Sequence, residues 1–240
     1  MSRPLQRGRR RLDELLTRTG RTHTFSLPSF LLVRAVERAL AEHARGDCLD
    51  AGSGRSPFRR RLERRGCRVT ALDVEDRGGA DLIADVQRMP QVPAGRFATV
   101  LCTQVLEHVP RPWRAIGELA RVLEPGGHLI VSVPHLSAVH EAPDDYFRFT
   151  RYGLRSLLED AGCEVLSLDE VGGIVAFLAH PLSYGLMSLG GGLPGVGPVV
   201  RWLNYLLLVR MLAPVDRLVG MQRIYPSNLL AVARRPSASR

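Results

Sequence analysis

The sequence predicts a doubly wound α/β domain, in which helices cover both faces of a mostly parallel sheet. Short apolar runs alternate with helical segments from residue 47 onward, and the first run passes into a loop with two glycines. The 240 residues are 45% hydrophobic, which is enough to form one large core. Because strands that alternate with helices form a parallel sheet, we expect ligands to bind at the carboxyl ends of the strands.

The elements follow one another in a regular order. Seven strands are expected, over residues 47–51, 68–74, 80–85, 97–103, 128–134, 164–171 and 228–235. Helices are expected over residues 29–43, 56–66, 111–127 and 150–163. Pro57 fits the first turn of the second helix, and a Pro-Gly-Gly stop closes the third. Thr150 is the expected N-cap of the fourth helix, and Gly162 is its expected stop.

The chain organisation has three parts. A basic tail and a cap helix occupy residues 1–45, the core occupies residues 46–171 and 227–236, and an apolar insertion occupies residues 172–226. Residues 171–200 contain no charged side chain, but glycines and prolines interrupt them, as at Pro181 and Gly185. We therefore expect an insertion that is helical in parts and acts as a cap or a dimer surface. Shallow contact with a membrane and a true membrane span are the alternatives.

Composition limits the classes of function. The net charge is +9, but all 33 basic residues are arginine and they gather in the tails and in residues 55–65. A solvated face explains this charge better than a nucleic-acid surface does, because basic residues do not alternate with aromatic ones. The four cysteines are well separated and lie in or beside apolar strands, as small core residues do in a reducing cytoplasm. No secretory signal and no metal site are expected.

The first glycine loop has an unusual third position. Asp50 ends the first strand, and Gly52 and Gly54 allow the backbone to lie against a ligand before the next helix begins. A dinucleotide loop favours a third glycine where this chain has Pro57. S-adenosylmethionine carries an amine, a carboxylate and a sulfonium, so an acidic residue is useful there and the third glycine can be relaxed. The pattern of one acidic residue and two glycines therefore favours S-adenosylmethionine over a dinucleotide.

Two further acidic residues end neighbouring strands. Asp73 follows the glycines by about twenty residues, where a carboxylate can accept hydrogen bonds from both ribose hydroxyls. Asp85 follows the third strand, where it can accept a hydrogen bond from an adenine amino group.

In order, "LDAGSG", "ALDVE", "ADVQRMP", "LCTQVLEHVP" and "RVLEPGGHLIVSVP" resemble the class I S-adenosylmethionine-dependent methyltransferases, nearest to the methyltransferase type 11 group. The resemblance covers about residues 48–171 and the final strand. It implies a Rossmann-like sheet of seven strands with an antiparallel last strand, and S-adenosylmethionine as cofactor. The cofactor-binding residues that it implies are Asp50, Ala51, Gly52, Ser53, Gly54, Asp73, Val74, Asp85, Val86, Thr103, Gln104 and His108.

A second block, "VPHLSAVHEAPDDYFRFTRYGLRSLLEDAGCEV", also resembles part of this group. It follows the fifth strand and so projects from the same rim as the glycine loop. His108 and His140 are the candidate general bases, and Asp145 and Tyr146 are further catalytic candidates. Alternatively, Tyr146, Phe147 and Phe149 pack the loop, and Arg148 pairs with Asp144 or Asp145.

These observations predict an enzyme that transfers a methyl group to an apolar or amphipathic small molecule, at an oxygen, nitrogen or carbon atom. A nucleic-acid or protein methyltransferase is the alternative, ahead of an NAD-dependent oxidoreductase or a non-catalytic cofactor-binding protein. The expected location is cytoplasmic, with membrane association, peripheral membrane contact and a homodimer left open.

Overall fold

A computed structural model describes residues 26–76, 78–191, 193 and 195–237. The expected basic tail falls on residues 1–25 and lies outside the described residues. The chain forms two compact units, and the first contains residues 35–169 together with the segment from Leu229. The second contains residues 170–228 and, of the described N-terminal residues, 26–34. The division falls inside helix α2 (Leu27–His43), so the second half of this expected cap helix belongs with the core.

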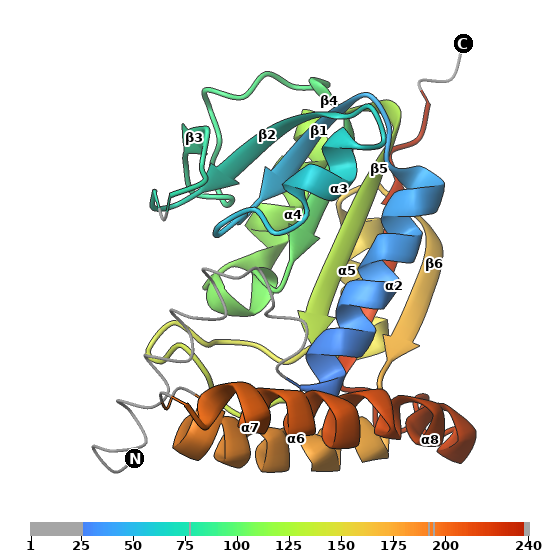
Figure 1. Ribbon diagram of the computed structural model, residues 1–240. Helices are drawn as coiled ribbons and strands as arrows, with labels where there is room; N and C mark the ends of the chain where they lie inside the picture. Colours follow the sequence, from blue (N-terminus) through green and yellow to red (C-terminus); the bar gives the residue numbers. More distant parts are fainter. Residues whose placement is uncertain (1–25, 77, 192, 194, 238–240) are drawn as a thin grey trace. The chain divides into compact units, whose positions relative to one another are not determined.

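The first unit is built on a mixed sheet of seven strands (Figure 1). Their order is β3 (Leu82–Ile83), β2 (Arg68–Asp73), β1 (Asp47–Ala51), β4 (Phe97–Thr103), β5 (Leu123–Pro134), β7 (Asn228–Arg234) and β6 (Glu164–Val171). The strands from β3 to β5 are parallel. At the start of β5, Gly126 N donates to Arg235 O, and Arg235 N donates to Gly127 O. The start of β5 thus lies beside the end of β7, so β7 is antiparallel, and the predicted sheet is confirmed.

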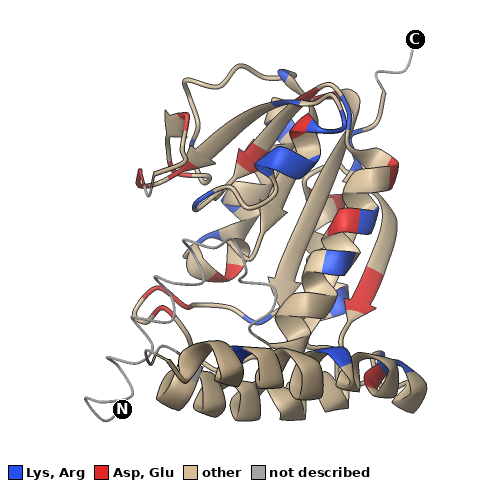
Figure 2. Cartoon of the chain, viewed as in Figure 1, with Lys and Arg blue, Asp and Glu red and all other residues tan. Residues whose placement is uncertain are grey.

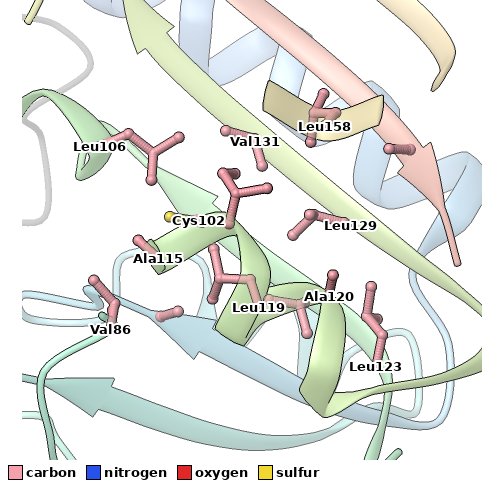
Figure 3. Close-up of a cluster of buried hydrophobic side chains, with 14 of the residues drawn as sticks. Val86, Cys102, Leu106, Ala115, Leu119, Ala120, Leu123, Leu129, Val131 and Leu158 are labelled. Carbon is pink, nitrogen blue, oxygen red and sulfur yellow. The ribbon is translucent and has the colours of Figure 1, made fainter. Parts of the chain in front are cut away.

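Helices pack on both faces of this sheet. Helices α4 (Pro112–Val122) and α5 (Arg151–Asp160) bury their apolar sides against β4 and β5, where Leu119 and Leu158 lie in one cluster with Val131 (Figure 3). On the opposite face, Arg45 N at the end of α2 donates to Thr99 Oγ1 of β4. Helix α3 (Arg59–Glu63) lies beside α2, joined to it by the ion pair between Arg61 and Glu37.

Two expected helices are shorter than predicted. Helix α3 begins at Arg59, so Pro57 lies in the preceding turn, next to Ser56 with its positive φ of 49°. Helix α4 ends at Val122, and the Pro-Gly-Gly sequence lies inside β5. The guanidinium of Arg235 donates to the carbonyl oxygens of Ala120, Arg121 and Leu123, which satisfies the free end of the helix. The expected N-cap of α5 is confirmed, since Thr150 Oγ1 accepts from Gly153 N at 3.1 Å.

The second unit contains the apolar insertion, which is helical as predicted. Its elements are α6 (Ile174–Leu186), the π-helical turn η3 (Met187–Gly191), α7 (Gly197–Leu203), the π-helical segment η4 (Asn204–Arg210) and α8 (Leu212–Val219). Pro181 and Gly185 were expected to interrupt it, but both lie inside α6. The helix continues through them because buried Ala176 and Ala179 pack against Val209, and packing outweighs one lost hydrogen bond.

Candidate cofactor and active site

The carboxyl ends of β1, β2 and β4 lie at one edge of the sheet. Asp50 is in register with Ala71 of β2 and Leu101 of β4. Thr103, the last residue of β4, is in register with Ser132 of β5. The chain order reverses between β1 and β4, and ligands of open α/β sheets bind at such a position.

The two glycines of the first loop serve different purposes. Gly52 has φ 69°, and a Cβ built on it would lie 2.3 Å from a methyl carbon of Val105, so no side chain fits. Gly54 has φ 55°, and a Cβ there would meet nothing within 4 Å. Gly54 therefore borders open space, where a ligand can approach the main chain. The loop is held in place because Gly52 N and Ser53 N both donate to Leu72 O.

Two buried carboxylates support this loop. Asp73 Oδ2 accepts from Gly54 N at 2.7 Å, and its side chain keeps further acceptor sites, because a carboxylate offers about four. Asp50 Oδ2 accepts from Ser56 Oγ at 2.7 Å. Burial raises the pKa of Asp50 to about 6, although the Ser56 hydroxyl opposes this shift.

The predicted adenine side is only partly available to a ligand. Asp85 is exposed, and its Oδ1 accepts from Gln87 N at 2.8 Å. Val74 is 61% exposed and can cover a flat ring, as an apolar wall does in ligand sites. Ala51 and Val86 are buried in the core cluster, where Figure 3 shows Val86, so they can contact a ligand only through their main chains.

The segment after β4 carries the second group of candidates. Gln104 has a positive φ of 54°, and its N–H donates to Ser132 O, which turns the chain sharply at the end of the strand. The 3-10 turn η2 (Leu106–His108) follows. His108 Nδ1 lies 2.6 Å from Asp144 O, and because a carbonyl only accepts, Nδ1 carries the proton. Nε2 of His108 therefore has the free lone pair.

Glu107 was not expected from the sequence to belong to the site. Its side chain is fully buried, and neither carboxylate oxygen has a hydrogen-bond partner. Burial raises its pKa to about 8. Its Oε1 lies 3.9 Å from His108 Nε2, and the His108 and His140 ring centroids are 4.9 Å apart. The available signal was its position directly before His108.

Asp145 forms a clamp that holds the loop carrying His140. Arg148 Nη1 and Nη2 bind the two Asp145 oxygens at 2.7 and 2.8 Å, and Asp145 Oδ2 also accepts from His140 N. Arg148 holds the pKa of Asp145 well below its usual range. Asp145 thus positions His140 and is not suited to accept a proton. Of the two expected acidic partners for Arg148, the structure selects Asp145.

The aromatic residues of this block fall into a buried pair and one exposed residue. Phe149 is buried in the core, and Phe147 packs against it with ring centroids 5.9 Å apart. Tyr146 was expected to pack the loop, but it is 48% exposed, with its hydroxyl donating to Asp144 Oδ1 at 3.0 Å. Tyr146 remains close to the cluster, because its N–H donates to Glu107 O.

The cluster formed by Glu107, His108 and His140 could bind a metal ion or transfer a proton. One ligand atom from each lies within 4.8 Å of the others, so within the described part of the chain these three could hold a divalent cation, which was not expected from sequence. They could equally accept and pass on a proton, since two imidazoles lie beside a buried carboxyl.

Three comparisons describe what the chain resembles. A family model for a methyltransferase domain matches residues 27–168, more than half of the 240 residues. A ubiquinone biosynthesis O-methyltransferase of Alkalilimnicola ehrlichii is 31% identical in an alignment of 125 positions, which covers 46% of this chain and 48% of that protein. The chain thus spans about half the length of the curated relatives it matches.

Solved structures agree on the fold. A 1,6-didemethyltoxoflavin-N1-methyltransferase of Burkholderia thailandensis is 17% identical, with a TM-score of 0.55 over 99% of this chain and 92% of that one. The cyclase SpnF is 19% identical, with a TM-score of 0.57 over 85% of this chain and 81% of that one. Since a cyclase has the same fold, the fold alone does not determine the reaction.

Proposed function

Because the chain belongs to the methyltransferase family and is a class I S-adenosylmethionine-dependent enzyme, we propose that it methylates a hydroxyl group of a small amphipathic molecule. The proposal rests above all on His108, whose Nδ1 is held by Asp144 O and whose Nε2 lies 3.9 Å from the buried Glu107 carboxyl. A base accelerates methyl transfer to a hydroxyl group that is not already ionised, and we assign this role to His108.

The residues present fit the cofactor. The open space at Gly54 admits a ligand against the main chain, and Ser53 Oγ is buried without a partner. Asp73 keeps acceptor sites for the ribose hydroxyls, and exposed Val74 can cover the adenine. When bound, the cofactor supplies an electrophilic methyl group, and the protein has to align the acceptor and exclude water.

In this proposal His108 Nε2 takes the hydroxyl proton as the acceptor oxygen attacks. Asp144 O keeps His108 in the required tautomer through Nδ1. In its ionised form the Glu107 carboxyl beside Nε2 stabilises the resulting imidazolium. Because burial raises the pKa of Glu107 to about 8, this form predominates above that pH. Asp145 and Arg148 act indirectly, by holding His140 next to His108.

The names of the relatives support methylation at an oxygen atom but do not identify the acceptor. The curated relatives are named for O-methylation in ubiquinone biosynthesis, whereas structures of similar fold are named for N1- and C-methylation. None of these names fixes the acceptor of this chain, which covers 48% of the first relative.

The test uses S-adenosylmethionine with a labelled methyl group and four panels of acceptors: amphipathic phenols and catechols, amines, total RNA, and peptides. We expect label in the phenol or catechol panel, with the methyl on oxygen by NMR. Methyl transfer to nitrogen, carbon, RNA or peptide would contradict the proposal. Each reaction is repeated with a chelator, since loss of activity would show that the Glu107 cluster holds a cation and does not act as a base.

The pH dependence of cofactor binding tests the role of Asp50. The cationic amine of the cofactor favours an ionised Asp50, whose pKa in the free protein is about 6. We expect the dissociation constant to be constant between about pH 6 and pH 7 and to rise by about tenfold per pH unit below this range. The amino-acid groups of the cofactor titrate outside about pH 5 to 7, so they do not cause this slope.

Calorimetric titrations between about pH 5 and pH 7 measure this slope. Asp50→Asn should bind more weakly and lose the slope. Ser56→Ala should move the break to higher pH, because the Ser56 hydroxyl stabilises the ionised form. A slope that persists in Asp50→Asn would show that another group is responsible.

A further inference from the structure

The second unit carries a large apolar surface. In Figure 2 helix α6 has no charged residue, and the helical segment 197–219 carries only a few. We define the apolar face by its exposed side chains Leu178, Leu182, Leu186, Leu189, Val199, Trp202, Leu207, Met211, Val215 and Leu218. Leu218 is 87% exposed and Leu182 is 63% exposed. Apolar patches of this kind mark a surface that contacts another body.

The helical segment Gly197–Val219 is the one described helix that is long and apolar enough to cross a membrane. Its inner side is nevertheless fixed to its own unit. Asp216 is 2% exposed, and its carboxylate accepts from Gly173 N and from Ala176 N at about 2.9–3.0 Å, capping helix α6. A span would break these bonds and move Asp216 into lipid, which is costly. The segment is therefore suited to lie in the plane of an interface.

The charged residues of the second unit favour contact with an anionic surface. Asp216 is the only acidic residue between residues 171 and 237, and it is buried. Arg210 and Arg217 are exposed and lie on the helical segment 197–219, which also carries six side chains of the apolar face. Two copies of the face would bring arginines together without an exposed acidic partner from this region, whereas an anionic lipid surface complements them.

We propose that the apolar face binds the surface of an anionic lipid bilayer, with the helical segment 197–219 lying in the plane of the interface. The apolar side chains enter the region between headgroups and acyl chains, and the arginine side chains extend to the phosphates. This inference is independent of the proposed acceptor, because it uses only residues of the second unit.

Trp202, which is 60% exposed on the apolar face, reports on binding. The chain has two tryptophans, so Trp113→Phe leaves Trp202 as the single fluorophore. With vesicles of phosphatidylcholine and phosphatidylglycerol we expect a blue shift and co-sedimentation. Vesicles of phosphatidylcholine alone should bind about tenfold to hundredfold more weakly at low salt, given about 1 kcal/mol for each arginine near the surface. Lipids brominated near the headgroup should quench Trp202 more than lipids brominated near the chain end.

The matched variants separate the face from net charge. Leu182→Glu with Leu207→Glu should lose vesicle binding at least about tenfold, since two side chains of the face can no longer enter the lipid. Tyr152→Glu with Leu166→Glu adds the same charge on exposed residues of the first unit and should bind nearly as the parent does. Circular dichroism and cofactor titration confirm that all variants are folded.

Three results would overturn the proposal. Equal binding of both double variants would show that the face is not involved. Stronger quenching by bromine near the chain end would show a span. A stable dimer in the absence of vesicles, converted to a monomer by Leu182→Glu with Leu207→Glu, would show that a second copy covers the face.

Discussion

Replacing Asp73 with alanine should weaken the binding of S-adenosylmethionine by roughly 10²- to 10⁴-fold. In the binding mode proposed above, Asp73 accepts two charge-assisted hydrogen bonds from the ribose hydroxyls, each worth about 1.5–3 kcal/mol, and the substitution removes both. Asp73 also accepts from Gly54 N, so its removal loosens the loop that borders the cofactor space. Isothermal titration calorimetry measures the effect directly and does not require the acceptor.

Asp73→Asn separates the two contributions. The amide keeps an oxygen that can accept from Gly54 N, but it has no negative charge and fewer acceptor sites. We expect a loss of about tenfold to hundredfold, smaller than that of Asp73→Ala. Asp169→Ala removes an exposed carboxylate of β6 and is the control for net charge. If Asp73→Ala bound the cofactor as tightly as this control, the ribose assignment would be wrong.

The sheet and the cofactor loop were predictable because each depends on local sequence. Apolar runs bounded by turn residues give the strands, and β4 begins and ends where the pattern predicts. Asp50 and Asp73 stand at strand ends, and parallel register then brings them to one edge. No contact between distant residues had to be known.

The active-site cluster required knowledge of distant contacts. Glu107 is an ordinary acidic residue in sequence, and only the fold buries both of its oxygens and brings His140 beside His108. Asp145 has the residue type of a catalytic acid, but the bidentate hydrogen bonds from Arg148 give it a structural role. Pro181 predicts the end of a helix, but α6 continues beyond Pro181 because its buried side chains pack against the rest of the unit.

Replacing His108 with glutamine should lower kcat for a hydroxyl acceptor by about 10²- to 10³-fold, because a general base contributes about that factor. Cofactor affinity measured by calorimetry should change little if His108 acts on the acceptor and not on the cofactor. His140→Gln should lower kcat less than His108→Gln does, because in this proposal His140 only packs against the His108 ring and does not take the proton.

The acidity of the acceptor distinguishes a base from a residue that only positions the substrate. A phenol that is already ionised at the assay pH needs no base, so the loss in His108→Gln should shrink steadily as the acceptor becomes more acidic. A residue that only positions the acceptor would cost the same factor for every phenol in the series. Glu107→Gln removes the carboxylate that stabilises the imidazolium above the Glu107 pKa of about 8, so in assays above that pH its loss should follow the same trend with a smaller slope. A constant loss across the series in His108→Gln would show that His108 orients the acceptor, and the enzyme would then work by alignment alone.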